Sequence, residues 1–538
     1  MQPVSPAPRS LLQAAGTGRT MNWLLEVRAA DRPTHPFLVW EPLVDTGRTW
    51  TYAEFAHAVT AVAEGLRRRG VRAGDKVLIH LDNCPEFLLT WFACARIGAV
   101  AVCTNTRSSQ DELSYFGSHS GASVVITQPS LASVVTNAVP DAKAVFVTDH
   151  NAGEPVSCAD LPGRTDRFAV LLDNEPGPAH PAGALDPVVI LYTSGTTGRP
   201  KAVTWTHANT MWAAKVNGSH VGLGPSDVTQ VYLPLFHTNA QSYSILPTLW
   251  AGGTVVLQPR FSASRFWGVA QKHGSTFASQ IYFALRALAT HDVPESHSFT
   301  RWGTGMNHHP TETYLQVPTI GWYGMTETVA APLAGDLLVP NRPGTIGRPA
   351  PHYEVVVLDD NGHPVGVGET GHLRVRGIPG ISLFGGYLHD EDATRAAFDE
   401  QGWFITGDRM TVHEDGSVSF VDRSKDVLRV AGENVAASEI ERVVLGVAGV
   451  AEAAVVAAPD PMRDEVPVAF VVGRPGSLGN ADLAEAVLAT CRRDLAGFKV
   501  PREVRIVEKL PRSTLEKIAK HELRALLQSE AATQSPQT

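Results

Sequence analysis

The chain has 538 residues, more than one hydrophobic core usually supports, so at least two domains are expected. Its composition, 43% hydrophobic and 18% charged without a long polar tract, is typical of a globular protein and excludes a disordered one. The net charge of −9 argues against a general nucleic-acid or anionic-membrane surface, so no nucleic-acid partner is expected and any basic site must be local.

The cysteines and the N-terminus indicate a cellular compartment. The five cysteines are scattered and contain no CxxC pair, so neither a disulfide framework nor a zinc site is expected. Residues 1–20 have proline where a signal peptide needs an apolar core, and we expect them to be flexible. Arg96 interrupts the most apolar region, residues 88–103, before it reaches membrane-spanning length. The sequence therefore predicts a soluble, cytoplasmic protein without membrane insertion, and it leaves the oligomeric state open.

Helix and strand patterns alternate in the first part of the chain. Thr51 and Glu54 form a capping-box pattern, and apolar residues then repeat at helical spacing until Gly70. Residues 75–81 are typical of a buried strand, and residues 85–99 of a second helix. This alternation predicts an α/β sheet covered by helical layers.

A hydroxyl-rich segment follows a further predicted strand, residues 188–192. The sequence YTSGTTGRPKAV, residues 192–203, places four small hydroxyls and two glycines in six consecutive positions from Thr193, then adds Arg199 and Lys201. Hydroxyls and exposed backbone N–H groups donate to anionic oxygen, and glycine lets the backbone approach closely. Because open α/β sheets bind ligands at the carboxyl ends of their strands, this loop predicts a site for a phosphate chain.

The pattern of apolar and turn residues changes twice in the later part of the chain. Residues 354–376 contain two apolar runs joined by turn residues, which predicts a hairpin-rich β subdomain. After Asp422, two further strand patterns lie between a helix that starts from a second capping-box pattern at Ser438 and a helix near residues 481–498. This part predicts a compact α+β domain, and residues 528–538 form a polar tail.

Several familiar motifs do not fit. The hydroxyl-rich loop is not a Walker A motif, because Lys201 follows proline rather than glycine. A GxGxxG match at residues 366–371 lies between two strand patterns without a following helix, so it predicts a turn rather than a dinucleotide site. Neither a nucleophile elbow nor an HExxH histidine pair is present, so hydrolase and metalloenzyme chemistry is not supported.

Five motifs follow one another in order along the chain. They are TSGTTGRPK (193–201), YGMTET (323–328), WFITGD (403–408), DRSKDVLRVAGENV (422–435) and PRSTLEKI (511–518). In this order they resemble the adenylate-forming superfamily of acyl-CoA synthetases, adenylation domains and luciferases, over nearly the whole chain after residue 20. The stretches HLDNCPEF, PLFHTNAQ and MRDE make the branch of carnitine/crotonobetaine-CoA ligases the most similar.

The resemblance implies a domain organisation. A large N-terminal α/β domain with several subdomains, one of them β-rich, would span residues 21–422. A hinge at residues 423–426, centred on Lys425, would lead to a small, mobile α+β domain over residues 427–527. Members of the superfamily switch from the first half-reaction to the second by rotating the small domain about this hinge.

The resemblance also implies the nucleotide site. The residues that would contact ATP or AMP are Thr193, Ser194, Gly195, Thr196, Thr197, Gly198, Lys201, Tyr323, Gly324, Met325, Thr326, Asp408 and Arg423. Tyr323 would stack on adenine, and Asp408 would accept the ribose hydroxyls. Glu327, with Thr196, would hold Mg²⁺ among phosphate oxygens, as a hard cation prefers. Taken singly, each of these residues is as easily a core aromatic, a surface acid or a turn residue, and only their joint spacing decides for function.

The resemblance also implies which residues act in catalysis and in thiol transfer. Lys517 resembles the lysine of the mobile domain that reaches the α-phosphate, and Thr193, Glu327 and His237 complete the predicted catalytic set. His237 resembles a histidine that guards the acyl and thiol route, although a hydrogen-bonded core histidine is its alternative. A glycine in a channel lets a narrow pantetheine arm pass. The resemblance implies that Gly432 and Arg429 form such a thiol channel.

The predicted acid pocket contains His237, Asn239, Trp322, Gly303 and Gly305. Trp322 stands directly before Tyr323, where the family usually has a small residue, so we expect a shortened or flattened pocket. Aromatic walls formed with Trp302, Tyr282 and Phe283 would favour a small or planar acid over a long fatty chain. The alternative is that Trp322 points into the core.

Two further departures concern charge. Glu516 stands where the family usually has glycine before the lysine, and Arg429 stands where lysine is usual. The leading interpretation is an ATP- and Mg²⁺-dependent ligase that activates an acid as acyl-AMP and transfers it to CoA. One alternative is a diazotase-like enzyme that adenylates nitrite for an arylamine, or uses another non-CoA acceptor. A second is an inactive nucleotide-binding sensor, against which Lys517, Glu327 and Asp408 argue.

Overall fold

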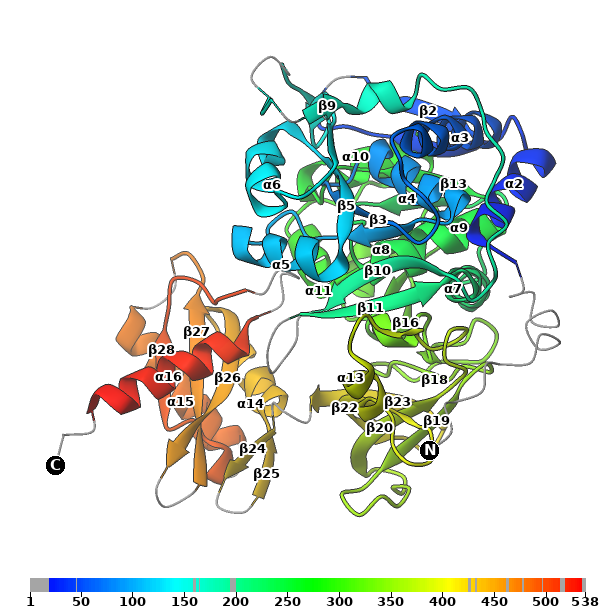
Figure 1. Cartoon of the computed structure of the whole chain (residues 1–538). Coiled ribbons are helices and arrows are strands. Elements are labelled where there is room, and N and C mark those ends of the chain that lie inside the picture. Colours follow the sequence, from blue (N-terminus) through cyan, green and yellow to red (C-terminus); the bar gives the residue numbers. More distant parts are fainter. Residues whose placement is uncertain are drawn as a thin grey trace.

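The computed structural model describes residues 19–534 apart from residues 45, 158–160, 164, 194–199, 424–426, 431–432, 461–463, 477–478, 496 and 513–517. Strands and helices alternate through a large N-terminal part, and a smaller C-terminal part, coloured orange to red, lies to one side of it (Figure 1). The predicted α/β class, with a large N-terminal and a small C-terminal domain, is confirmed. Among the described helices, none has both the length and the apolar character that crossing a membrane requires.

The largest sheet has nine strands, and those in its centre are parallel. In spatial order they are β18 (Arg348–Pro349), β17 (Leu333–Ala334), β16 (Thr319–Tyr323), β15 (Arg301–Thr304), β14 (Phe277–Ser279), β12 (Val228–Val231), β13 (Thr254–Leu257), β1 (Pro36–Trp40) and β2 (Arg48–Thr51). Buried apolar residues fill most positions of the central strands, because helices cover both faces.

A second sheet has eight strands and carries the hydroxyl-rich loop. In spatial order they are β21 (Gly386–Tyr387), β11 (Lys201–Thr206), β10 (Pro187–Thr193), β4 (Val100–Cys103), β3 (Lys76–His80), β5 (Ala122–Thr127), β6 (Ala144–Val147) and β9 (Thr165–Arg167). The strands predicted at residues 75–81 and 188–192 are confirmed as β3 and β10. Strands β10 and β11 form an antiparallel hairpin whose last pair is Thr193 and Lys201, and the loop between them, residues 194–199, lies outside the described residues.

Helices pack around these two sheets (Figure 1). They are α2 (Met21–Asp31), α3 (Tyr52–Arg68), α4 (Pro85–Ile97), α5 (Gln110–Ser120), α6 (Ala132–Ala138), α7 (His207–His220), α8 (Thr238–Ala240), α9 (Leu246–Ala251), α10 (Ala263–His273), α11 (Tyr282–Leu288), α12 (Glu312–Leu315) and α13 (Glu391–Ala396). Shorter turns are η1 (Pro129–Leu131), η2 (Phe168–Leu171), the π-helical η3 (Gln241–Ile245) and η4 (Thr326–Thr328). Helix α3 begins at the predicted capping box of Thr51 and Glu54 and buries the predicted apolar stripe.

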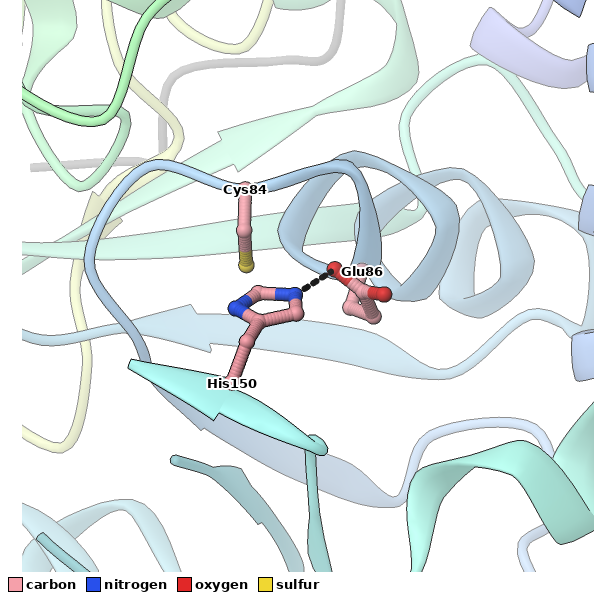
Figure 2. Close-up of side chains that lie close together, drawn as sticks. All are labelled: Cys84, Glu86 and His150. Carbon is pink, nitrogen blue, oxygen red and sulfur yellow. Dashed lines mark hydrogen bonds and ion pairs between the residues drawn. The ribbon is translucent and has the colours of Figure 1, made fainter. Parts of the chain in front are cut away.

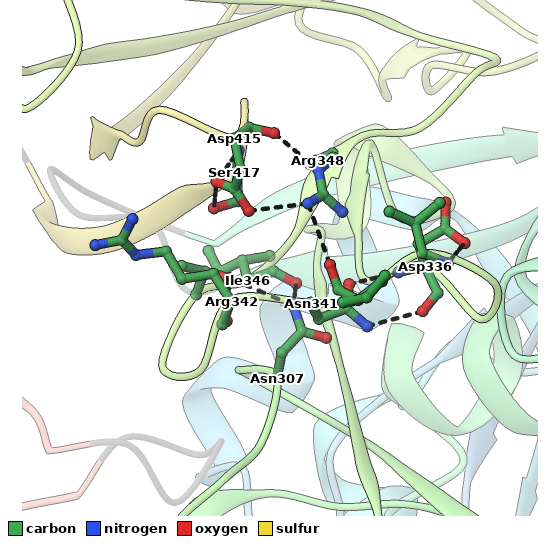
Figure 3. A network of polar contacts seen from close by, with 11 residues as sticks. Asn307, Asp336, Asn341, Arg342, Ile346, Arg348, Asp415 and Ser417 are labelled. Carbon is green, nitrogen blue, oxygen red and sulfur yellow. Dashed lines mark hydrogen bonds and ion pairs between the residues drawn. The ribbon is translucent and has the colours of Figure 1, made fainter.

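The predicted β-rich subdomain is a four-stranded antiparallel sheet of β19 (Glu354–Leu358), β20 (Thr370–Arg376), β22 (Phe404–Val412) and β23 (Val418–Arg423). The GxGxxG match forms the turn that leads into β20, and its Gly368 has a φ of +84°, so the predicted turn is confirmed. A polar network joins this sheet to the nine-stranded one (Figure 3). In it, Arg348 of β18 pairs with Asp415 at 2.9 Å, on the turn between β22 and β23.

The C-terminal part comprises β24 (Val427–Val430), β25 (Glu433–Ala436), α14 (Ala437–Leu445), β26 (Val450–Asp460), β27 (Asp464–Gly473), α15 (Asn480–Asp494), η6 (Gly497–Lys499), β28 (Glu503–Ile506) and α16 (Lys520–Gln534). The capping box predicted at Ser438 is wrong. Helix α14 begins one residue earlier, and the Ser438 hydroxyl donates to the carbonyl of Val421 at 2.5 Å instead. A contact with the neighbouring strand β23 therefore takes the place of a local cap.

A short ribbon, β7 (His150–Asn151) with β8 (Glu154–Pro155), is fastened to the start of α4 (Figure 2). The His150 Nε2–H donates to the Glu86 carboxylate at 3.1 Å, and the Gly153 N–H donates to His150 Nδ1 at 3.3 Å. The buried Cys84 lies beside this pair. Since both ring nitrogens have protein partners, the cluster serves as a hydrogen-bonded tie between the ribbon and the helix.

Candidate active site

The predicted adenine and ribose residues meet between two sheets. The Tyr323 hydroxyl, at the carboxyl end of β16, donates to Asp408 Oδ2 at 2.5 Å, although 85 residues separate them. Asp408 is only 2% exposed and lies on β22, directly opposite Arg423 of β23 in the antiparallel register. A buried carboxylate facing the end of a parallel strand is placed to accept hydrogen bonds from a ligand bound at that edge.

A second contact chain links the hydroxyl-rich hairpin to the YGMTET motif. The Lys201 ammonium lies 4.6 Å from the ring centroid of Tyr387, a cation–π contact, and the Tyr387 hydroxyl donates to Glu327 Oε1 at 2.9 Å. Burial, and then the neighbouring charge of Glu327, raises the pKa of Tyr387, so its hydroxyl remains a donor. Tyr387 thus connects a cation and a carboxylate that were each predicted to act on ATP phosphates.

Sequence reasoning did not single out Tyr387. It belongs to the two-residue strand β21, which pairs with β11 through Tyr387 and Val203. The sole sequence signal is an aromatic directly after two glycines in GGYLHD, residues 385–390. Such a signal is too common to identify a site without the sheet pairing.

The segment after Tyr323 is held by hydrogen bonds from distant elements. The indole N–H of the fully buried Trp205 donates to the Thr326 carbonyl at 2.8 Å, and the Thr238 hydroxyl donates to Thr326 Oγ1 at 2.9 Å. The backbone N–H of Phe384 donates to the Glu327 carbonyl at 2.9 Å. These bonds fix the direction of the Glu327 carboxylate, which is 6% exposed.

His237 lies on a loop clamped by a buried asparagine. The Asn83 side chain donates to the Leu233 carbonyl at 3.0 Å and accepts from the Leu235 N–H at 2.7 Å. His237 and Thr193 both line a cavity of about 60 Å³. Its other lining residues are Cys103, Asn105, Ser108, Glu112, Phe116, Tyr192, Pro200 and Phe236. The structure therefore brings these two predicted catalytic residues to one cavity.

The predicted pocket residues Trp322 and Gly303 are in contact. A Cβ atom added to Gly303 would lie 2.2 Å from Trp322 Cζ2, so the absence of a side chain on β15 makes room for the indole of β16. Trp322 is 7% exposed, and its ring also packs edge-on against two other rings. The distance between ring centroids is 4.6 Å to Tyr243 and 6.0 Å to Phe277. Gly305 has no neighbour within 4 Å of such a Cβ.

The expected partnership of Trp322 with Trp302 is wrong. Trp302 is fully buried in a different aromatic cluster. Its ring centroid lies 5.3 Å from that of Phe299 and 5.7 Å from that of Phe266. Successive side chains of a strand point to opposite faces, so the residue before Gly303 cannot share its face. Tyr282 and Phe283 are more than half exposed, and they do not form a closed wall with Trp322.

The loop after β15 is tied to its neighbours through Asn307 (Figure 3). Its side chain accepts from the Gly321 N–H at 2.7 Å and donates to the Ile346 carbonyl at 3.0 Å. These bonds hold the loop next to β16, at Gly321, which directly precedes Trp322.

The remaining predicted site residues fall into three groups. Those outside the described residues are Ser194, Gly195, Thr196, Thr197, Gly198, Lys425, Gly432 and Lys517. For Arg423 and Arg429 the strand positions alone are described, on β23 and β24. Gly324 and Met325 lie between Tyr323 and η4. The Met325 Sδ atom lies 3.9 Å from the Tyr323 hydroxyl oxygen, whose proton is donated to Asp408.

Comparison with known proteins agrees with this geometry. A family model described as AMP-binding enzyme matches residues 25–388, and one described as AMP-binding enzyme C-terminal domain matches residues 439–517. The chain belongs to the AMP-binding enzyme family and is an ATP-dependent, AMP-forming acid ligase. The predicted resemblance is thereby confirmed.

Individual relatives extend over nearly the whole chain. The crotonobetaine/carnitine–CoA ligase of Proteus mirabilis (strain HI4320) is 31% identical over 505 residues, which is 90% of this chain and 95% of the relative. ATP-bound MatB from Rhodopseudomonas palustris aligns with a TM-score of 0.81 and 26% identity, covering 94% of this chain and 99% of that one. The anthranilate CoA ligase AuaEII in complex with anthranoyl-AMP aligns with a TM-score of 0.84 and 25% identity, covering 96% and 98%.

Proposed function

We propose that the chain activates a small or planar carboxylic acid as an acyl-AMP, with release of pyrophosphate, and then transfers the acyl group to the thiol of CoA. The observation that carries the choice of acid is the Trp322 indole packed against Gly303, at the position where the family usually has a small residue. An indole there occupies volume that a long acyl chain would need. The relatives named as CoA ligases support CoA as the acceptor.

In this proposal the nucleotide lies between β10, β16 and β22, which belong to three different sheets. Tyr323 stacks on adenine, and Asp408 accepts the ribose hydroxyls with Arg423 nearby. The phosphates are bound by the loop from Thr193 to Gly198 and by Lys201. Met325 and Gly324 line the adenine side of the site.

Glu327 and Thr196 supply the oxygen donors that would hold Mg²⁺. A carboxylate and a hydroxyl are donors that this hard cation prefers, and Glu327 is held in place at both its carboxylate and its backbone. Mg²⁺ would supply charge neutralisation on the phosphate oxygens.

The chemistry explains why cationic residues dominate this site. An acid carboxylate attacking the α-phosphorus meets an anion, so negative charge must be neutralised at the nucleophile, the phosphorus centre and the leaving pyrophosphate. Lys517 would serve the α-phosphate and Lys201 the leaving group. An ionised acid needs no general base, so the absence of a Ser-His-Asp pattern is no objection.

The second half-reaction requires a change of domain position in this proposal. Rotation at residues 423–426, about Lys425, would withdraw Lys517 and bring Gly432 and Arg429 to the site. His237 would guard the path between the acyl group and the thiol. Its cavity, shared with Thr193, supports a place at the meeting point of acid and nucleotide.

We also infer a cytoplasmic location. The four cysteines among the described residues are all free and buried, which fits a reducing compartment. The inferred partners are a small-molecule acid and CoA.

Release of pyrophosphate from a panel of acids, first without and then with CoA, tests the proposal. Acid-dependent pyrophosphate release, followed by CoA-dependent release of AMP, is the expected result. Turnover with nitrite and an arylamine, without any with carboxylic acids, would establish the diazotase alternative instead. Binding of ATP without turnover of any acid would leave the sensor alternative.

The Tyr387 contact gives a first specific prediction. Tyr387→Phe keeps the ring under Lys201 but removes the hydrogen bond to Glu327. A hydrogen bond to a charged group is worth about 1.5–3 kcal/mol, so we expect kcat for pyrophosphate release to fall at least about 10-fold. The Mg²⁺ concentration for half-maximal activity should rise in the same assay.

Tyr353→Phe is the matched control for Tyr387→Phe. Tyr353 is a buried tyrosine, and its hydroxyl donates to the Thr328 carbonyl at 2.7 Å without touching Glu327. This variant should lose stability but keep the Mg²⁺ requirement. Equal Mg²⁺ curves for wild type and Tyr387→Phe would contradict the assigned role.

A further inference from the structure

Two buried polar atoms near the predicted acid pocket, the hydroxyl oxygen of Tyr243 and Oδ1 of Asn239, have no hydrogen-bond partner among the described residues. Oε1 of Gln241, between them in the chain, is also unpaired, but the amide nitrogen of that side chain donates to the Leu235 carbonyl at 2.7 Å. Tyr243 is 5% exposed, so its hydroxyl cannot rely on bulk water. A buried polar group left unpaired costs about 1–3 kcal/mol, which makes an orphaned pair in one short segment a feature that needs an explanation.

Both side chains come from one stretch that follows His237. Asn239 lies on α8, and Tyr243 lies on the π-helical turn η3 that continues it. Single π-helical turns inside α-helices are frequently found at functional sites. This local irregularity supports a role for the two side chains beyond packing.

Tyr243 lies where the predicted acid and nucleotide sites meet. Its ring packs edge-on against Trp322, at 4.6 Å and an interplanar angle of 74°. A Cβ atom added to Gly324 would lie 2.0 Å from the Tyr243 hydroxyl oxygen, so the hydroxyl reaches the backbone directly after Tyr323. The Tyr243 ring therefore packs against the predicted pocket residue Trp322, and its hydroxyl lies beside the YGMTET motif.

The chemistry of the two atoms is complementary. Burial raises the pKa of Tyr243, so its hydroxyl stays protonated and can donate a hydrogen bond. Asn239 Oδ1 can only accept one. A hydroxyl or primary amino group both accepts and donates, so it can pair with either atom, whereas a hydrocarbon can pair with neither.

We propose that the acid substrate carries a hydroxyl or amino substituent, and that Tyr243 and Asn239 recognise it and determine specificity. This inference rests on the proposed function and narrows its substrate class. The Trp322 ring limits the size of the acid, and the two orphaned polar atoms select its polarity.

The experiment compares kcat/KM for benzoate with that for its hydroxy- and amino-substituted forms, in pyrophosphate release by the full chain. One neutral hydrogen bond to an otherwise unpaired buried group corresponds to about 10-fold or more, so at least one substituted acid should exceed benzoate by that factor. Tyr243→Phe should bring this ratio close to one, mainly by lowering kcat/KM for the substituted acid. Asn239→Ala should reduce the same ratio independently.

Tyr232→Phe is the control. Tyr232 is also buried, but its hydroxyl donates to Gln280, so the variant should leave the ratio unchanged. Thermal unfolding of each variant reports whether it folds.

Three outcomes would overturn the inference while leaving the proposed function intact. One is equal kcat/KM for substituted and unsubstituted acids. Another is an equal loss of kcat/KM for the substituted and the unsubstituted acid in Tyr243→Phe. That result would mean that the Tyr243 hydroxyl binds the carboxylate that both acids carry. The third is a ratio that survives in both Tyr243→Phe and Asn239→Ala. Absence of turnover with every acid would instead contradict the proposed function.

Discussion

Replacing Lys517 with glutamine is expected to lower the rate of acyl-AMP formation by about 10²- to 10³-fold. Removing one preorganised group that stabilises transition-state charge costs about 2.7–4 kcal/mol, and Lys517 is the cation assigned to the α-phosphate. The same variant should form the thioester from chemically prepared acyl-AMP and CoA at nearly the wild-type rate. Single-turnover measurement of each half-reaction separates the two effects.

An exposed lysine in the same part of the chain provides the control for Lys517→Gln. Lys509 lies eight residues earlier, between β28 and the PRSTLEKI motif. Lys509→Gln removes the same charge from the same domain and should leave both half-reactions unchanged. If Lys517→Gln formed acyl-AMP as fast as wild type, the assignment of this lysine would be wrong.

Replacing Trp322 with alanine is expected to change which acids are activated. The indole fills the space over Gly303, so its removal should open the pocket to longer chains. One methylene in a hydrophobic pocket is worth about 1–3 kcal/mol. We therefore expect kcat/KM for a longer acid, relative to its shorter homologue, to rise about 10-fold or more per accommodated methylene. Pyrophosphate release with a series of straight-chain acids measures this ratio.

The contact between Trp322 and Gly303 supplies a second variant. Gly303→Ala places a Cβ 2.2 Å from the indole, so in the wild-type background it should lower activity and stability. In the Trp322→Ala background the same change should be tolerated, which is a coupling that distant residues do not show. A wild-type preference for long acyl chains, or an unchanged chain-length profile in Trp322→Ala, would contradict the role given to Trp322.

Elements with strong local signals could be predicted from the sequence. Helix α3 begins at a capping box and carries its apolar residues at helical spacing, so neighbours along the chain define it. The β10 strand and the hairpin of β19 and β20 follow equally from short apolar runs and turn residues. The motif order likewise predicted the family, because each motif is a continuous stretch.

The failures occurred where a distant element competes with a local pattern. Ser438 has the local sequence of a helix cap, yet a carbonyl on β23 takes its hydroxyl. Trp302 and Trp322 were both predicted to line the pocket. Side chains of β15 alternate between the two faces of the sheet, however, so the Trp302 side chain packs in a separate aromatic cluster. Propensity describes a few neighbouring residues, and tertiary contacts override it when they bury more surface or pair more polar groups.

By itself, then, the amino-acid sequence determined the α/β class, the order of the motifs and the chemistry their residue types allow. Only the tertiary structure decided which of these residues meet. Tyr323 bonds Asp408 across 85 positions, Tyr387 connects Lys201 with Glu327, and Tyr243 reaches Gly324. Such contacts depend on strand pairing and on the packing of sheets against each other, which are set by burial of the whole core and leave no periodic trace in any one segment.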